Sequence, residues 1–371
     1  MVVFGTRPEA IKLAPVVRAF QDSDSAELCV VVTAQHRQML DQVLDVFGIR
    51  PEVDLNLMLP GQTLAGFTAR ALVELDRVYA ELSPDLVLVQ GDTATVLAAS
   101  LGAFYRRIPI GHVEAGLRTF DLNAPWPEEA NRVLTSHIAS LHFAPTPQSR
   151  LNLLAEGIPS EKIHVTGNTA IDALLLARDM LASHPKTVPG LPAETLDGHR
   201  LVLITGHRRE SFGNGFNGIC EGISALAARY PQVHFIYPVH LNPNVRKPVE
   251  ALLGRNRHPN VHLLEPLPYL PFVRLMEASC LLLTDSGGIQ EEAPSLGKPV
   301  FVMRDTTERP EAVQAGTSRM VGTNPEVIQR EVSRVLDNAD EYSKMTSGRN
   351  PFGDGHAAEM IRDISLRFLS R

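Results

Sequence analysis

Short apolar runs alternate with longer segments of helical periodicity along almost the whole chain. The runs are typical of buried parallel strands, and the apolar positions between them are spaced as one face of a helix. We expect strands at 1–4, 28–33, 85–90, 108–113, 140–144 and 163–166, and again at 200–205, 233–238, 261–264, 279–284, 299–303 and 318–322. Expected helices include 8–20, 62–82, 93–106, 217–229 and 325–340. This alternation predicts an α/β fold built from βαβ units.

The two series of strands are separated by residues 180–199, which are rich in Pro, Gly and His. We therefore expect two doubly wound domains, with a linker there or slightly earlier, near Gly167. The boundary adopted here assigns 1–167 to an N-terminal domain and 168–356 to a C-terminal domain. A chain of 371 residues, 44% of them hydrophobic, can form two full cores.

Polar clusters follow the predicted strands in both halves of the chain. They lie at 5–9, 35–37, 90–93, 114–118, 206–209, 240 and 286–288. Open α/β sheets bind ligands at the carboxyl ends of their strands. We therefore expect the two domains to face each other across a central cleft that these clusters line.

The segment Ser286-Gly287-Gly288 leads from a predicted strand into a short helix. Its backbone amides and the helix dipole favour a phosphate group, and Glu292, one turn later, suits a ribose diol. The alternative is an ordinary turn capped by Asp285 or Ser286.

Thr6 and Glu9 form a predicted capping box at the start of a helix. Arg7 would lie at that helix N-terminus, where a cation is favourable only beside an anion, so we expect Arg7 to contact an anion. Lys12 could supplement this contact, or it could be solvated.

Three carboxylates, Asp92, Glu114 and Glu128, are predicted near one edge of the first domain. Such a group raises at least one pKa and suits proton transfer. Asp92 and Glu114 could instead be caps or turn residues, and Glu128 could form a surface ion pair with Arg132.

His207 and Arg208 supply positive charge after a strand of the second half, where we expect contact with a phosphate or leaving group. Arg309 is a weaker candidate for the same role. Residues 213–218 match G-x-G-x-x-G, but they lie well past the end of their strand. We interpret them as a flexible loop that orders when ligand binds.

Net charge is −7, which excludes a general nucleic-acid or membrane-surface binder. The three cysteines have no C-x-x-C spacing, so we expect a reducing cytoplasm and no structural zinc. Neither a metal nor a cofactor is expected at the site. Apolar runs of membrane-spanning length are absent from the sequence. We also expect a homodimer.

Six motifs in a fixed order resemble those of the non-hydrolysing UDP-N-acetylglucosamine 2-epimerases, across nearly the whole chain. They are FGTRPEA (4–10), QGDT (90–93), HVEAGLRT (112–119), PEEANR (127–132), GHRRE (206–210) and DSGGIQEE (285–292). The resemblance implies a GT-B fold of two Rossmann-like domains, with a C-terminal helix at 357–371 crossing back onto the first. It also implies interconversion of UDP-GlcNAc and UDP-ManNAc by elimination of UDP to 2-acetamidoglucal and re-addition.

The resemblance further implies that Phe272 flanks the uracil, Glu292 the ribose, and Arg132 the substrate. Within this mechanism Asp92, Glu114, Glu128 and His207 are the catalytic candidates, with base and acid unassigned. A possible second site for activating UDP-GlcNAc involves Gln35, Gln38 and His240, although Gly61 stands where an arginine is expected.

Three alternatives remain at this point. A hydrolysing relative would release free N-acetylmannosamine, and a GT-B glycosyltransferase would need an acceptor site. A non-catalytic UDP-sugar sensor would bind without turnover.

Overall fold

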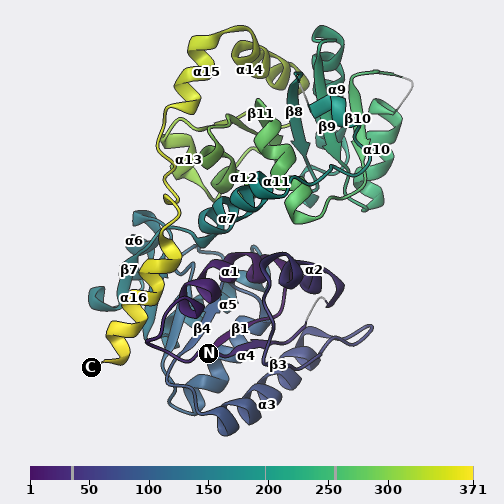
Figure 1. Ribbon diagram of the computed structural model, residues 1–371. Helices are drawn as coiled ribbons and strands as arrows, with labels where there is room; N and C mark the ends of the chain where they lie inside the picture. The colour runs from purple at the N-terminus through teal and green to yellow at the C-terminus, as the bar shows by residue number, and fades with distance from the viewer. Residues whose placement is uncertain (35–36, 197, 255–256, 371) are drawn as a thin grey trace. The chain divides into compact units, whose positions relative to one another are not determined.

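The computed structural model describes residues 1–34, 37–196, 198–254 and 257–370, with side chains at 37 and 38 left out (Figure 1). The chain divides into two compact units, Met1–Leu176 with Phe352–Arg371, and Ala177–Pro351. Helix α7 (Thr169–Ser183) begins in the first unit and ends in the second. Each unit is described by itself below.

The described residues of the first unit form a sheet of seven parallel strands in the order β3-β2-β1-β4-β5-β6-β7. The strands are β1 (Val2–Phe4), β2 (Val30–Val32), β3 (Val53–Asp54), β4 (Val87–Gln90), β5 (Ile110–Val113), β6 (Leu141–Ala144) and β7 (Ile163–Val165). The order reverses between β1 and β4, and doubly wound sheets bind ligands at such a point.

Helices cover both faces of this sheet (Figure 1). Val2 and Phe4 of β1 pack with helices α1, α2 and α16, whereas Val3 points to the other face and packs with α3 and α4. The helices of the unit are α1 (Arg7–Gln21), α2 (Arg37–Phe47), α3 (Leu64–Leu82), α4 (Ala94–Tyr105), α5 (Glu128–Ile138), α6 (Pro147–Ala155), the turn η1 (Ser160–Lys162) and α16 (Ala357–Leu369). Helix α16 packs against α1, so the C-terminal segment completes the core of the first unit.

The second unit contains six parallel strands among its described residues, in the order β10-β9-β8-β11-β12-β13. They are β8 (Arg200–Thr205), β9 (Val233–Pro238), β10 (Val261–Leu264), β11 (Leu281–Thr284), β12 (Val300–Val302) and β13 (Ser318–Met320). This order reverses between β8 and β11, which again defines the expected ligand edge.

One face of the second sheet packs against α9, α10 and α14, and α11 contacts β8. The helical segments are α8 (Ala193–Leu196), η2 (Arg209–Ser211), α9 (Asn214–Arg229), α10 (Pro243–Leu253), α11 (Tyr269–Ala278), α12 (Gly287–Glu292), η3 (Ala293–Leu296), α13 (Pro310–Gln314), α14 (Pro325–Asp337) and α15 (Ala339–Thr346). Among the described residues, no helix is long and apolar enough to cross a membrane.

All twelve predicted strands are present, and most of them are buried apolar runs, although β7 and β13 are only partly buried. Strand β3 was not predicted, because it has only two residues. The helix predicted at 325–340 is present but ends earlier than predicted. Helix α14 ends at Asp337, and the side chain of Asn338 caps the separate helix α15 through the amides of Asp340 and Glu341.

The flexible loop predicted at 213–218 is wrong, since Gly213 is the N-cap of α9 and residues 214–218 begin the helix. A Cβ at Gly218 would lie 2.4 Å from the carbonyl oxygen of Thr323, and one at Gly222 would lie 3.2 Å from Ile328. The two glycines therefore allow α9 to pack closely against the start of α14, and no nucleotide-binding fingerprint is needed to explain them.

Candidate functional site

Glu114 lies directly after β5 and is almost fully buried. Its carboxylate accepts hydrogen bonds from Lys12 Nζ at 2.5 Å, from Asn168 Nδ2 at 3.0 Å and from the side-chain amide of Gln90. The backbone has φ +64°, a conformation that a residue with a side chain rarely adopts. Three side chains thus hold a buried carboxylate in a strained position, which is typical of a functional residue.

Lys12 is therefore not the solvated lysine considered above. In this structure its ammonium group pairs with Glu114, and its side chain is 17% exposed.

Asp92 follows β4, the strand that pairs with β5. Arg132 Nη1 donates to Asp92 Oδ2 at 3.1 Å, and Asn131 Nδ2 donates to the Asp92 carbonyl at 2.8 Å. Burial, the largest effect, raises the pKa of Asp92 to about 6; the charges of Glu114 and Glu128 add to it, while Arg132 and Lys12 oppose it. The structure thus brings the predicted carboxylates together, and it gives one of them a pKa close to neutral.

Arg132 is oriented by Glu129, which the sequence analysis did not single out. Glu129 is 1% exposed, and its Oε2 accepts from Arg132 Nε at 2.6 Å. Its other oxygen accepts from the backbone amides of Thr119 and Phe120 at 3.1 and 3.0 Å. Across the part of the chain that the structure describes, Arg132 pairs with Glu129 and Asp92 and not with Glu128, so the surface pair weighed above is absent.

Arg7 is the first residue of α1, as expected, and is half-buried. The capping box is present: Glu9 Oε2 accepts from the amides of Gly5 and Thr6, and Glu9 Oε1 accepts from Thr93 Oγ1 at 2.6 Å. Glu9 therefore connects the turns after β1 and β4, the two strands at which the order reverses.

In the second unit, Asp285 holds the turn after β8. Its buried Oδ2 accepts from the backbone amides of His207 and Arg208 at 2.6 and 2.7 Å, so it does not cap α12. The His207 ring stacks on that of His240, with centroids 5.5 Å apart. Burial is the main cause that lowers the pKa of His207, with Arg208 and His240 acting in the same direction and Asp285 against it.

The turn after β11 offers two backbone amides. The amide of Ser286 donates to Thr284 Oγ1 at 2.9 Å, whereas those of Gly287 and Gly288 have no acceptor within the described residues. A Cβ at Gly287 would lie 2.8 Å from the guanidinium carbon of Arg309, so this glycine permits close contact with the arginine. Of the amides of Ser286, Gly287 and Gly288, which were predicted to favour a phosphate, the last two are therefore available for one.

Arg309 is held by carboxylates in this structure. Its Nε donates to Glu291 Oε1 at 2.8 Å, and Nη1 lies 3.4 Å from Glu308 Oε2. Burial raises the pKa of Glu308, but the positive charges of Arg304 and Arg309 outweigh burial and lower this pKa to about 2. Both arginines therefore face an ionised carboxylate.

The remaining candidates are placed as follows. Phe272 is half-buried on α11, Glu292 is half-buried at the end of α12, and His240 is exposed after β9. Gln35 and the side chain of Gln38 lie outside the described residues.

Similarity to known proteins agrees with this geometry. The profile of the family described as UDP-N-acetylglucosamine 2-epimerase matches residues 18–365. The chain belongs to the UDP-N-acetylglucosamine 2-epimerase family. Its relatives include the UDP-N-acetylglucosamine 2-epimerase of Escherichia coli K12, 57% identical over 97% of this chain and 96% of that protein.

Solved structures of epimerases also resemble the chain. The UDP-GlcNAc 2-epimerase of Neisseria meningitidis bound to UDP-GlcNAc is 51% identical, with a TM-score of 0.90 and 99% of each chain covered. The epimerase of Methanocaldococcus jannaschii in complex with UDP-GlcNAc and UDP is 36% identical, with a TM-score of 0.80 over 99% of each chain. The predicted GT-B fold with two Rossmann-like domains is confirmed.

Proposed function

We propose that this epimerase is of the non-hydrolysing type and interconverts UDP-GlcNAc and UDP-ManNAc. The observation that carries the proposal is the site around Asp92 and Glu114, in a chain that matches the epimerase family over nearly its whole length. The hydrolysing enzyme and the glycosyltransferase are less favoured, because this chain aligns over nearly its whole length with bacterial proteins named UDP-N-acetylglucosamine 2-epimerase.

The reaction requires one proton to leave carbon 2 of the sugar while UDP leaves carbon 1. The proton then returns to the opposite face of 2-acetamidoglucal as UDP adds back. A carboxyl group with a pKa of about 6 can accept and donate protons near neutral pH, which makes Asp92 suitable for this exchange. Glu114 and Glu128 complete the proposed acid–base group and stabilise the oxocarbenium-like ring as the bond to UDP breaks.

The second unit supplies the proposed contacts to UDP. Donors and a cation at the leaving group stabilise the charge that develops there. We assign Gly287, Gly288, Ser286, His207, Arg208, His240 and Arg309 to the pyrophosphate region, Glu292 to the ribose and Phe272 to the uracil. Because the pKa of His207 is lowered, this ring contributes as a neutral hydrogen-bonding group unless the bound diphosphate protonates it. Arg7, Lys12 and Arg132 are the proposed contacts from the first unit.

We further propose a cytoplasmic homodimer that needs no cofactor. Apolar side chains are exposed on two contacting helices, Val73 on α3 and Phe104 and Tyr105 on α4, and a second copy would cover them. Tyr105→Glu should shift the molar mass measured by light scattering from dimer to monomer. An unchanged mass would refute this face as the interface.

The function is tested by following UDP-GlcNAc with the purified protein by NMR. We expect UDP-ManNAc to accumulate to a constant ratio with UDP-GlcNAc. Asp92→Asn and Glu114→Gln should slow this conversion at least about a hundredfold with little loss of UDP affinity. Accumulation of free N-acetylmannosamine and UDP would instead identify a hydrolysing enzyme, and UDP-GlcNAc binding without turnover would identify a sensor.

A further inference from the structure

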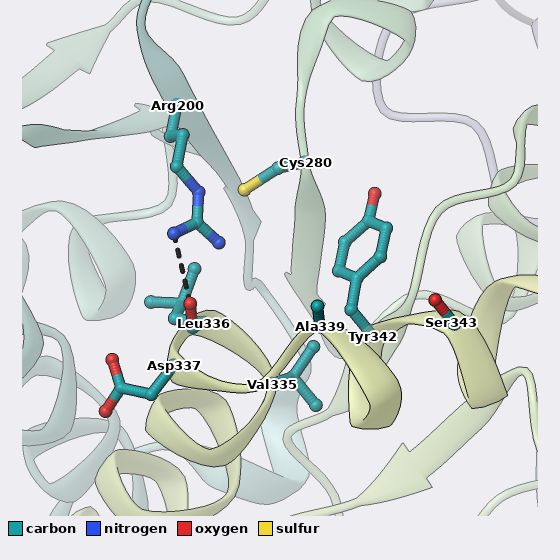
Figure 2. A pocket seen from close by; sticks show the side chains of 8 residues that line it. All are labelled: Arg200, Cys280, Val335, Leu336, Asp337, Ala339, Tyr342 and Ser343. Carbon is teal, nitrogen blue, oxygen red and sulfur yellow. Dashed lines mark hydrogen bonds between the residues drawn. The ribbon is translucent and has the colours of Figure 1, made fainter.

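A cavity of about 440 Å³ lies in the second unit at the amino ends of two neighbouring strands (Figure 2). Arg200 begins β8, and Cys280 directly precedes β11. The other lining residues come from the end of α14 and the start of α15: Val335, Leu336, Asp337, Ala339, Tyr342 and Ser343. His207 and Ser286 follow the same two strands at their carboxyl ends, so this cavity is at the opposite edge of the sheet from the proposed nucleotide contacts.

Arg200, the cation that lines the cavity, is not paired with a carboxylate among the described residues. Arg200 Nη1 donates to the Leu336 carbonyl at 3.0 Å, and within the described part of the chain the guanidinium forms no ion pair. Asp337 Oδ2 instead accepts from Arg229 at 2.9 Å and from the Tyr230 hydroxyl at 2.8 Å. A guanidinium has five N–H donors, so Arg200 retains donors for a ligand.

The rest of the lining is largely apolar. Val335, Leu336 and Ala339 present aliphatic side chains, and Tyr342 adds an aromatic ring (Figure 2). The Tyr342 hydroxyl makes no hydrogen bond to any other described residue, so it can donate to an anion beside Arg200. Figure 2 also shows the sulfur of Cys280 pointing toward the guanidinium.

We propose that this cavity binds a small organic anion, namely a carboxylate attached to an aromatic or branched apolar group. The planar guanidinium matches a carboxylate, and the apolar walls match the remainder of such a molecule. The volume falls within the range of small-molecule sites. Arg200 is the cation that lines the cavity, and one guanidinium suits one carboxylate and not the several charges of a nucleotide.

Cys280 provides a direct test, because its thiol reports what enters the cavity. Two aromatic disulfides are compared: dithiobis(nitrobenzoate), which carries carboxylates, and the neutral dithiodipyridine. In each case the Cys280 thiolate attacks a disulfide sulfur, a mixed disulfide forms, and the other half of the reagent leaves as a thiolate. Modification of Cys280 is followed on the full-length protein by peptide mass spectrometry, which separates it from Cys29 and Cys220.

We expect the rate with the anionic reagent to saturate as its concentration rises, since binding precedes reaction, and the rate with the neutral reagent to rise linearly. Arg200→Gln should abolish saturation. It should also lower, roughly three- to tenfold, the ratio of the Cys280 modification rate with the anionic reagent to that with the neutral reagent. The ratio corrects for any effect of Arg200 on the thiol itself, which alters both reactions alike.

Arg200→Lys, which keeps the charge, should restore part of the ratio. Arg330→Gln on the exposed surface of α14 should leave it unchanged. In the unaltered protein, added salt should lower the ratio without any substitution. Linear kinetics with both reagents, no reaction at Cys280, or an unchanged ratio in Arg200→Gln would each overturn the proposal.

Discussion

Replacing Arg132 by glutamine should move the titration of Asp92 to higher pH. Arg132 Nη1 lies 3.1 Å from Asp92 Oδ2, and its positive charge favours the ionised carboxylate. The substitution also leaves the buried Glu129 without its partner, and this second negative charge acts in the same direction. Both effects favour the protonated form of Asp92.

The size of the shift follows from the exposure of the pair. The Asp92 side chain is 29% exposed and that of Arg132 is 10% exposed, so solvent screens the interaction only in part. Two charges at this distance interact by about 1.3 kcal/mol in bulk water and by about 5 kcal/mol at a surface site. Partial screening places this pair in the lower part of that range, at about 1 to 3 kcal/mol or roughly one to two pKa units. An inflection near pH 6 in the parent enzyme should therefore appear at about pH 7 to 8 in Arg132→Gln.

The assay is kcat/KM for epimerisation measured between about pH 5 and 9, because this ratio reports groups of the free enzyme. The inflection moves to higher pH whether Asp92 acts as base or as acid. The assignment decides only whether kcat/KM rises or falls with pH through this inflection. Asp92→Asn should remove the inflection, and Arg106→Gln, which breaks an exposed pair with Asp76, should leave it in place. An inflection that stays fixed or moves downward in Arg132→Gln would refute the electrostatic role of this arginine.

Other predictions concern stability and binding. Gly218→Ala should lower the free energy of unfolding by about 1 to 3 kcal/mol in urea titrations, because its Cβ would clash with Thr323, whereas Gly215→Ala, with 3.5 Å of room, should be neutral or slightly stabilising. Equal effects of the two would contradict close packing of α9. Arg118→Met should destabilise the protein by about 3 to 5 kcal/mol, because it leaves Glu156 without its bidentate partner; a loss below about 1 kcal/mol would contradict this. Asp285→Asn should weaken UDP binding in calorimetry roughly tenfold, because the amides of His207 and Arg208 lose a charged acceptor; unchanged affinity would show that this turn does not bind UDP.

The strands were predictable because parallel strands are buried on both faces and read as apolar runs. Placement of polar clusters at the carboxyl ends followed from the same pattern. The start of α9 was not predictable in this way, because glycine usually interrupts helices and only its contact with Thr323 explains it. The end of α14 likewise depends on capping by Asn338, which the apolar periodicity does not reveal.

The candidate site was predictable by residue type but not by contacts. Capping of the following helix by Asp285 was one alternative in the sequence analysis, but Asp285 binds the turn after β8, because β8 and β11 are neighbours in the sheet although far apart in sequence. Glu129 was missed because its neighbour Glu128 has the same side chain. A signal was available, since Glu129 and Arg132 are three residues apart and face the same side of α5.

The central claim, elimination and re-addition of UDP with proton exchange at carbon 2, is tested most directly by running the reaction in D2O. The account predicts that NMR will show deuterium at carbon 2 of both UDP-GlcNAc and UDP-ManNAc once they have interconverted. UDP-ManNAc that retains the original proton at carbon 2 would contradict it.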